Sequence, residues 1–132
     1  MKKFNYKDDK ITEMIIQCII RVHKILGPGF LESIYKNALL IELKNSGLKC
    51  EAEKLIKIYY NNIEIGTHRL DIVVENKIII ELKTVEELCG QHYAQIKSYL
   101  RATNLKTGIL VNFAKEKADF RRIENEYTGI KE

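Results

Sequence analysis

The chain has 132 residues, of which 45% are hydrophobic and 30% charged, and its formal net charge is +4. This length is typical of one compact domain, so we expect residues 1–132 to form a single unit with its core over about 11–113. The longest apolar runs, 14–20 and 78–82, fall short of the roughly 20 residues of a membrane-spanning helix. No apolar stretch follows the basic start of the chain, so we expect neither a membrane span nor a signal peptide.

The net charge and the cysteines exclude few classes of function. A mildly basic chain is compatible with a nucleic-acid partner, although many other proteins share this balance. Cys18, Cys50 and Cys89 form no C-x-x-C pair, and they complete no zinc-binding spacing with the histidines. We therefore expect reduced thiols and a cytoplasmic location.

Two helices are predicted first. Apolar residues recur with helical spacing from Ile11 to Leu26 and leave one apolar face. Gly27-Pro28-Gly29 breaks that pattern, and a second helix is predicted from about Phe30 to Asn45.

The pattern then changes to strands. Alternating stretches cover 48–60 and 63–65 with Asn61-Asn62 as the turn, and apolar strands are predicted over 68–74 and 78–83. A helix over about 91–102, a buried strand over 107–113 and a short helix over 118–123 complete the order, with a flexible tail over about 124–132. This order predicts an α/β fold with helices packed on a mixed sheet.

The strand pair 69–74 and 78–83 carries the chemistry. A turn centred on Asn76 places Asp71 directly opposite Glu81, with Lys83 two residues further along the same face. In this register the other face is entirely apolar, and it consists of Leu70, Ile72, Val74, Ile78, Ile80 and Leu82. Slipping the register by one residue would mix the two sets, so the pattern favours the register in which the three charged groups meet.

Two opposed carboxylates repel each other, and folding alone does not require this arrangement. A divalent cation between Asp71 and Glu81 would remove that cost, and oxygen ligands suit Mg²⁺ or Mn²⁺. The ammonium of Lys83 would polarise a water molecule or stabilise negative charge that develops on a phosphate. The alternative is that all three are solvent-facing residues of an amphipathic strand pair.

Asp71 together with Glu81-Leu82-Lys83 resembles the motif of the PD-(D/E)XK nuclease superfamily, although Leu70 stands where the name implies proline. The resemblance implies a restriction-endonuclease-like αβββαβ core, with a mixed central sheet flanked by helices and, in this chain, an extra N-terminal helix. It also implies metal-dependent hydrolysis of phosphodiester bonds in nucleic acid, with DNA as the expected substrate.

Two further motifs extend the resemblance over about 11–113. Residues 29–35 read G-x-x-E-x-x-Y through Gly29, Glu32 and Tyr35, which is similar to the signature of the small bacterial GxxExxY proteins. Gln95 and Tyr99 resemble the Q-x-x-x-Y motif of the RecB-like nuclease branch, and His92 also fits that pattern.

The resemblance implies roles for these residues, and each also has a structural interpretation. Glu32 is expected to be a third metal-binding acid, or an acid that favours the start of its helix. Gln95 is expected to support the carboxylates or Lys83, or to lie in a polar stripe. Tyr99 and His92 would contact phosphate, or pack and cap a helix, and Tyr35 is expected to anchor its helix to the sheet.

Three functional classes remain open at this point. The leading hypothesis is a Mg²⁺-dependent nuclease in which Asp71, Glu81 and Glu32 bind metal while Lys83 and Gln95 assist. The second is a non-catalytic nucleic-acid-binding or regulatory module on the same fold. The third is a subunit that depends on a homodimer or a targeting partner, which an exposed apolar patch on an N-terminal helix would mark.

Overall fold

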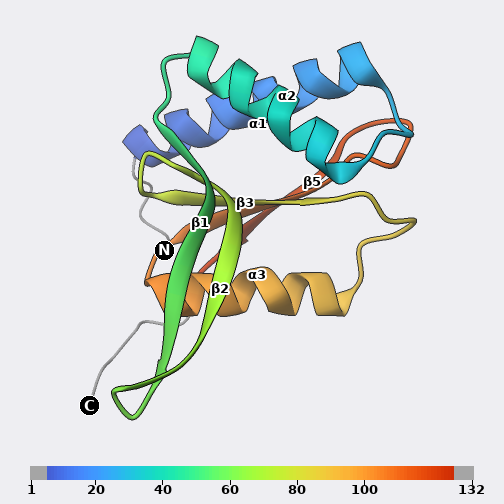
Figure 1. The fold of residues 1–132 in the computed structure, drawn as a ribbon. Coiled ribbons are helices and arrows are strands. Elements are labelled where there is room, and N and C mark those ends of the chain that lie inside the picture. The colour runs from blue at the N-terminus through green and yellow to red at the C-terminus, as the bar shows by residue number, and fades with distance from the viewer. Residues whose placement is uncertain (1–5, 127–132) are drawn as a thin grey trace.

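The computed structural model describes residues 6–126, which form three helices and five strands within that range (Figure 1). In chain order these are α1 (Tyr6–Leu26), α2 (Glu32–Asn45), β1 (Cys50–Tyr60), β2 (Ile63–Val74), β3 (Ile78–Lys83), α3 (Gly90–Thr103), β4 (Thr107–Asn112) and β5 (Asp119–Glu124). No helix in the described range is long and apolar enough to cross a membrane.

The five strands form one mixed sheet in the order β1-β2-β3-β4-β5. Strands β1 to β3 form an antiparallel meander, β3 pairs with β4 in parallel, and β5 is antiparallel to β4. Helix α3 makes the crossover between the two parallel strands, as a parallel connection requires. The α/β fold expected from the sequence is therefore confirmed, and it is consistent with a restriction-endonuclease-like core.

Helices cover both faces of the sheet (Figure 1), and each face has its own apolar cluster. On one face, α1 and α2 pack against side chains such as Ile72, Ile80 and Val111. On the other, α3 packs against Val73 and Leu110. Strands β3 and β4 are buried on both faces, which explains why their sequences are almost continuously apolar.

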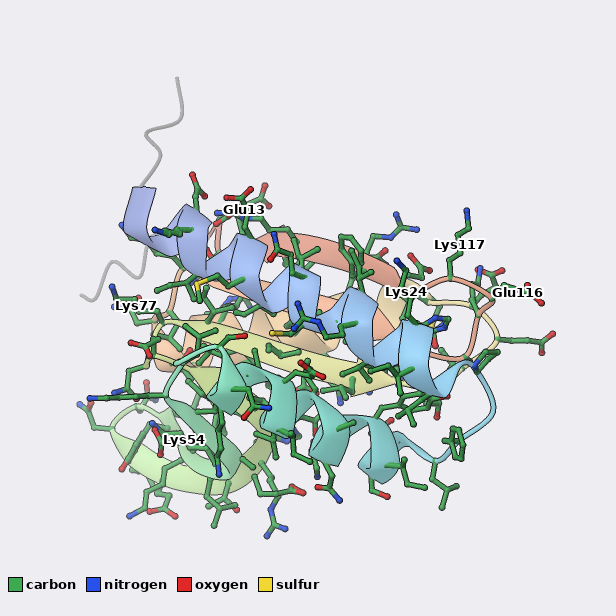
Figure 2. All side chains as sticks on the ribbon, turned by 90° about the horizontal axis from the view of Figure 1, so that it is seen from above. Glu13, Lys24, Lys54, Lys77, Glu116 and Lys117 are labelled. Carbon is green, nitrogen blue, oxygen red and sulfur yellow. The ribbon has the colours of Figure 1, made fainter. Side chains whose placement is uncertain are left out.

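The helical layer presents its charged side chains to the outside. Seen from above in Figure 2, Glu13 and Lys24 point away from α1, and Lys117 projects from the loop before β5. The apolar positions of α1, by contrast, turn towards the sheet, where Ile15 and Ile19 are fully buried. The amphipathic pattern over 11–26 therefore predicts the buried face of this helix correctly.

Tyr35 holds the loop between α1 and α2. Its hydroxyl donates to the carbonyl of Gly27 at 2.5 Å and accepts from the amide of Phe30 at 3.1 Å. The ring is fully buried and stacks on Phe113 with 4.6 Å between the ring centroids. This contact anchors α2 to the end of β4, as expected for Tyr35, and it fixes where Glu32 begins the helix.

The expected short helix over 118–123 is wrong, because Asp119–Glu124 forms β5. Phe120 packs with the cluster under α1 and α2, whereas Ile123 belongs to the cluster under α3. This division between two faces is the alternation of an edge strand. The core therefore extends beyond the expected limit at Phe113, and the expected tail lies outside the described residues from 127 onward.

Candidate active site

The candidate site lies where β2 and β3 stop pairing through their backbones. The predicted register is confirmed by the pairs Ile72↔Ile80, Val73↔Ile79 and Val74↔Ile78. The backbone pairing then stops before Asp71 and Glu81. The Asp71 amide donates to Oε1 of Glu81 at 3.2 Å, and the Leu82 amide donates to Oδ2 of Asp71 at 2.9 Å. Each carboxylate thus accepts a backbone hydrogen bond from the opposite strand.

The pairing of β2 with β1 is interrupted at the same point. Ala52 pairs with Ile72 and Lys54 pairs with Leu70, but Glu53 and Asp71 do not pair. Glu53 has a φ of 56°, a left-handed conformation that is uncommon for residues other than glycine. Asp71 of β2 therefore lies where backbone pairing is interrupted on both sides, towards β1 and towards β3.

This break also corrects one expectation about the faces of β2. Leu70 was expected beside Ile72 on one apolar face, but it lies in the other cluster, with Val73 and Ile79. The regular alternation of a strand does not continue through the interruption at Asp71, and the residues before it change sides. The assignment of Leu70 is therefore wrong, whereas the register of the strand pair is right.

Burial raises the pKa of both carboxyls and so favours their protonated forms. The side chain of Glu81 is 5% exposed, and desolvation followed by the charge of Asp71 raises its pKa to about 8. Desolvation also raises the pKa of Asp71, against the opposing effects of the Leu82 amide and the Lys36 and Lys83 charges. The two groups are close enough to titrate together, as expected for acids that share one site.

Within residues 6–126, each of these carboxylates has one oxygen that accepts no hydrogen bond. Asp71 uses only Oδ2 and Glu81 uses only Oε1, so Oδ1 and Oε2 are left over. A partly buried carboxylate oxygen without a donor is costly unless a cation or water meets it. The donor chemistry fits a hard divalent cation such as Mg²⁺.

Lys83 is held by α3 through Gln95. Its Nζ donates to Oε1 of Gln95 at 2.9 Å, and the side chain of Gln95 also hydrogen-bonds to Tyr99. Desolvation, and after it the charges of Glu81 and Asp71, raise the pKa of Tyr99. The structure thus brings Gln95 and Tyr99, which share one face of α3, to the strand pair, where the resemblance placed them.

Glu32 approaches the same acids from α2. It lines a groove of about 410 Å³ together with Ser33, Lys36, Glu53 and Asp71. Desolvation and the charge of Asp71 raise the pKa of Glu32, while the charges of Lys83 and Lys36 lower it. The described residues nevertheless contain no group of three or more His, Cys, Asp or Glu side chains placed to hold a metal ion. Asp71 and Glu81 therefore form the acidic pair of the site, and Glu32 lies near Asp71 without completing a group of three metal ligands among the described residues.

The structure places His92 and Tyr35 in structural positions. Nδ1 of His92 accepts from the Cys89 amide at 3.0 Å and caps the N-terminus of α3. Tyr35 contacts the loop before α2 and the end of β4 instead of the acids. The position of His92 matches the capping alternative, and the position of Tyr35 matches its expected role as an anchor.

Sequence reasoning missed Lys36 and Glu53, which form an ion pair 2.5 Å long beside Asp71. Lys36 lies one turn after Glu32 on the same helix face, so its spacing was a usable signal. No comparable sequence signal exists for Glu53, because its position opposite Asp71 depends on the register of the β1–β2 hairpin. That register shifts at an irregularity between Ile58 and Tyr59.

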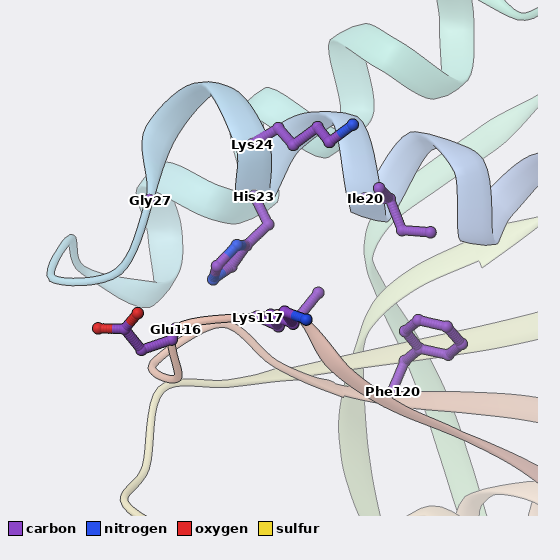
Figure 3. A pocket seen from close by; sticks show the side chains of 8 residues that line it. Ile20, His23, Lys24, Gly27, Glu116, Lys117 and Phe120 are labelled. Carbon is purple, nitrogen blue, oxygen red and sulfur yellow. The ribbon is translucent and has the colours of Figure 1, made fainter.

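Another cavity, of about 500 Å³, lies between the end of α1 and the loop before β5 (Figure 3). His23 points into it, and its Nε2 is 2.7 Å from the carbonyl oxygen of Lys115. Most of the lining is apolar, and it includes Ile20 and Phe120. None of the predicted site residues lines this cavity, so we do not assign it to the candidate site.

A mixed sheet covered by helices, with an aspartate at a strand break facing Glu-x-Lys on the next strand, is consistent with the restriction-endonuclease-like class of proteins. The chain belongs to the PD-(D/E)XK nuclease superfamily, because residues 9–123 match that family. Members of this superfamily are typically metal-dependent.

The crystal structure of a protein named SSO0001 is similar, with 28% sequence identity and a TM-score of 0.55. The similar region covers 70% of this chain and 50% of that one, so this chain spans about half the length of SSO0001. No curated protein gives a significant match.

Proposed function

We propose that the protein is a Mg²⁺- or Mn²⁺-dependent nuclease that hydrolyses phosphodiester bonds in DNA. The observation that carries the proposal is the pair of carboxylates at the strand break, each with one oxygen bound to backbone and one without a donor. Asp71 and Glu81 would hold the cation, and water molecules would complete its coordination shell. When bound, such a cation supplies a Lewis acid that polarises the phosphate and acidifies water.

The other residues of the site prepare the reaction. Gln95 accepts a hydrogen bond from Lys83 and so fixes the ammonium group beside the acids. This charge is placed to stabilise the negative charge that grows on the phosphate during hydrolysis. Glu32 adds a third acid at the opening of the site, within electrostatic reach of Asp71 and Lys83.

We assign the chain to the GxxExxY branch within the superfamily, with a RecB-like Gln95 and Tyr99. Gly29 has a φ of 113°, which favours glycine at the first position of the motif. Tyr35 fixes the loop, and Glu32 then faces Asp71. The spacing of the motif is thus explained by one loop and one helical turn that bring an acid to the site.

We also infer one folded unit in the cytoplasm that works with a second copy or a targeting partner. The free thiols of Cys18, Cys50 and Cys89 support the location. Large apolar side chains remain exposed on the outer side of α2, at Ile34 and Ile41, and support a protein contact there.

Thermal unfolding with added MnCl₂ or MgCl₂ tests the metal site. We expect either ion to raise the melting temperature of the wild type but not of Asp71→Asn. Glu13→Gln, an exposed carboxylate on α1, is the control and should respond like the wild type. A response that is the same in Asp71→Asn and the wild type would refute the assignment.

A cleavage assay tests the reaction itself. Purified wild type should nick DNA with Mn²⁺ present and lose this activity in EDTA. Lys83→Ala and Asp71→Ala should reduce cleavage at least about 100-fold, the scale seen when a charge-stabilising group is removed. Equal cleavage by the wild type and both variants would identify a contaminating nuclease. A metal response without cleavage would favour the non-catalytic module.

A further inference from the structure

The hairpin of β1 and β2 extends well beyond the body of the protein and crosses α3 (Figure 1). We call its outer part, residues 55–69, the arm. Its tip carries side chains that the fold does not bury, including Tyr59 at 59% exposed and Tyr60 at 67%. Asn61 and Asn62 both have positive φ, so a tight turn closes the tip and keeps the two strands paired.

A cleft of about 840 Å³, which we call the arm cleft, lies between the arm and α3. The arm contributes Lys57, Tyr59 and His68, and α3 contributes Tyr99 and Arg101. Such a volume suits a small organic unit and is too small for a double helix. The cleft can therefore enclose an unstacked nucleotide, whereas a duplex would have to lie outside it.

The charge of the arm cleft favours an anion. No Asp or Glu side chain is among the residues that line it, whereas Lys57 and Arg101 supply positive charge. Lys57 also lies 3.7 Å from Glu64, but both side chains are about half exposed, and a surface pair of this kind is weak. A phosphate can therefore compete for the ammonium of Lys57.

Aromatic rings line the same cleft. His68 and Tyr99 stack with 4.1 Å between their ring centroids, and Tyr59 lies on the arm with its ring exposed. A basic groove with aromatic rings is the combination that binds single-stranded nucleic acid, because bases stack on rings while cations follow the backbone. The composition of the arm cleft thus points to unpaired nucleotides.

Tyr99 links the arm cleft to the residues of the candidate active site. This residue lines the cleft, hydrogen-bonds to Gln95 and lies within electrostatic reach of Glu81. Gln95 in turn holds Lys83. Tyr99 and Gln95 therefore connect the arm cleft to Lys83 along α3.

We propose that the arm cleft binds an unpaired segment of the DNA substrate, with one base stacked on Tyr59 and a phosphate beside Lys57 and Arg101. This inference rests on the proposed nuclease function, and it adds a preference for single-stranded DNA. It predicts that a duplex without unpaired nucleotides binds more weakly than its separated strand.

Fluorescence anisotropy of the full chain in EDTA tests the proposal without cleavage. The probes are a labelled DNA strand of about 12 nucleotides, the same sequence as a duplex, and the same sequence as RNA. Tyr59→Ala should weaken binding of the DNA strand roughly tenfold, while Tyr59→Phe retains the ring and should bind within about twofold of the wild type. Tyr60→Ala is the matched control, because Tyr60 is also an exposed tyrosine at the tip but is not among the described residues that line the cleft.

Equal affinity of Tyr59→Ala and Tyr60→Ala would overturn the proposal, and so would a duplex that binds as tightly as the single strand. Binding of the RNA strand but not of the DNA strand would overturn the assignment to DNA. Binding in EDTA does not depend on the metal site, whereas the cleavage assay does. A failure of the cleft and a failure of the nuclease function are therefore distinguished.

Discussion

Glu81 makes the free energy of unfolding depend on pH. A carboxyl whose pKa is raised from 4.5 to about 8 on folding stabilises the fold while it is protonated. Without metal, this contribution is fully present below a pH of 4.5 and is lost as pH rises through about 8. We therefore expect the metal-free wild type to become less stable over this interval.

Glu81→Gln should remove most of this dependence. At about pH 9 in EDTA, we expect the variant to be about 2 kcal/mol more stable than the wild type, because no charge is buried. Urea unfolding at several pH values measures this difference. Identical pH profiles for Glu81→Gln and the wild type would show that Glu81 is ionised in the folded chain throughout.

In the proposed mechanism, Gln95 positions Lys83 through the hydrogen bond between their side chains. Gln95→Ala should lower the cleavage rate about tenfold, because a hydrogen bond to a charged group contributes about 1.5–3 kcal/mol. The loss should appear in kcat more than in KM, since Gln95 acts through Lys83. Gln91→Ala, at an exposed position one turn earlier on α3, is the control. An effect on KM alone would show that Gln95 contributes to substrate binding instead.

At the scale of elements, the packing of α3 against β4 depends on Gly108. A Cβ added to Gly108 would lie 2.8 Å from Cδ1 and 3.1 Å from Cγ1 of Ile96, which is fully buried beside Gln95. We expect Gly108→Ala to reduce the free energy of unfolding by about 1–3 kcal/mol through overpacking. Chemical denaturation measures the loss.

Two further variants show whether this contact is responsible. Ile96→Val in the Gly108→Ala background should recover part of the loss, because it removes the crowded Cδ1 atom. Gly66→Ala is the control, since its added Cβ would meet no atom within 4 Å. Equal losses at Gly66 and Gly108 would point to strand conformation as the cause.

The strand elements also show what the sequence could and could not predict. The β2–β3 register followed from the alternation of Ile and Val about Asn76, and the structure confirms it. The face of the sheet on which Leu70 lies could not be predicted from this alternation, because it depends on the interruption of pairing opposite Glu53. A glutamate with positive φ has no local sequence signal, since such conformations are normally associated with Gly or Asn.

The candidate site was predictable where strand spacing or the resemblance to a known motif placed a residue. Gln95 was expected to support Lys83 or the carboxylates, and the structure shows the contact with Lys83. The prediction of a helix over 118–123 was wrong for a different reason. Two adjacent arginines separate Phe120 from Ile123, so the sequence does not show clear strand alternation, and the strand becomes evident only from its pairing with β4.

At the scale of the whole molecule, we expect that shortening the arm leaves the thermal stability of the remaining fold almost unchanged. The tip 59–65 can be replaced by an Asn-Gly turn, because Ile58 and Gly66 already pair across the hairpin. The large side chains removed are exposed, so little apolar burial is lost. We expect the melting temperature to stay within about 2 °C of the wild type.

Differential scanning calorimetry measures this change, and the metal-induced rise in melting temperature should persist in the shortened chain. A loss of cooperative unfolding would show that the tip contributes to the fold.

The two backbone amides at the strand break provide an intrinsic readout of the site. Those of Asp71 and Leu82 donate to the very carboxylates that would receive a cation. Any change in the charge of these groups must therefore alter the electronic environment of the two N–H protons. In a ¹⁵N-labelled sample, these resonances should move together during a proton or Mg²⁺ titration, so occupancy can be followed in the unmodified chain without any substrate.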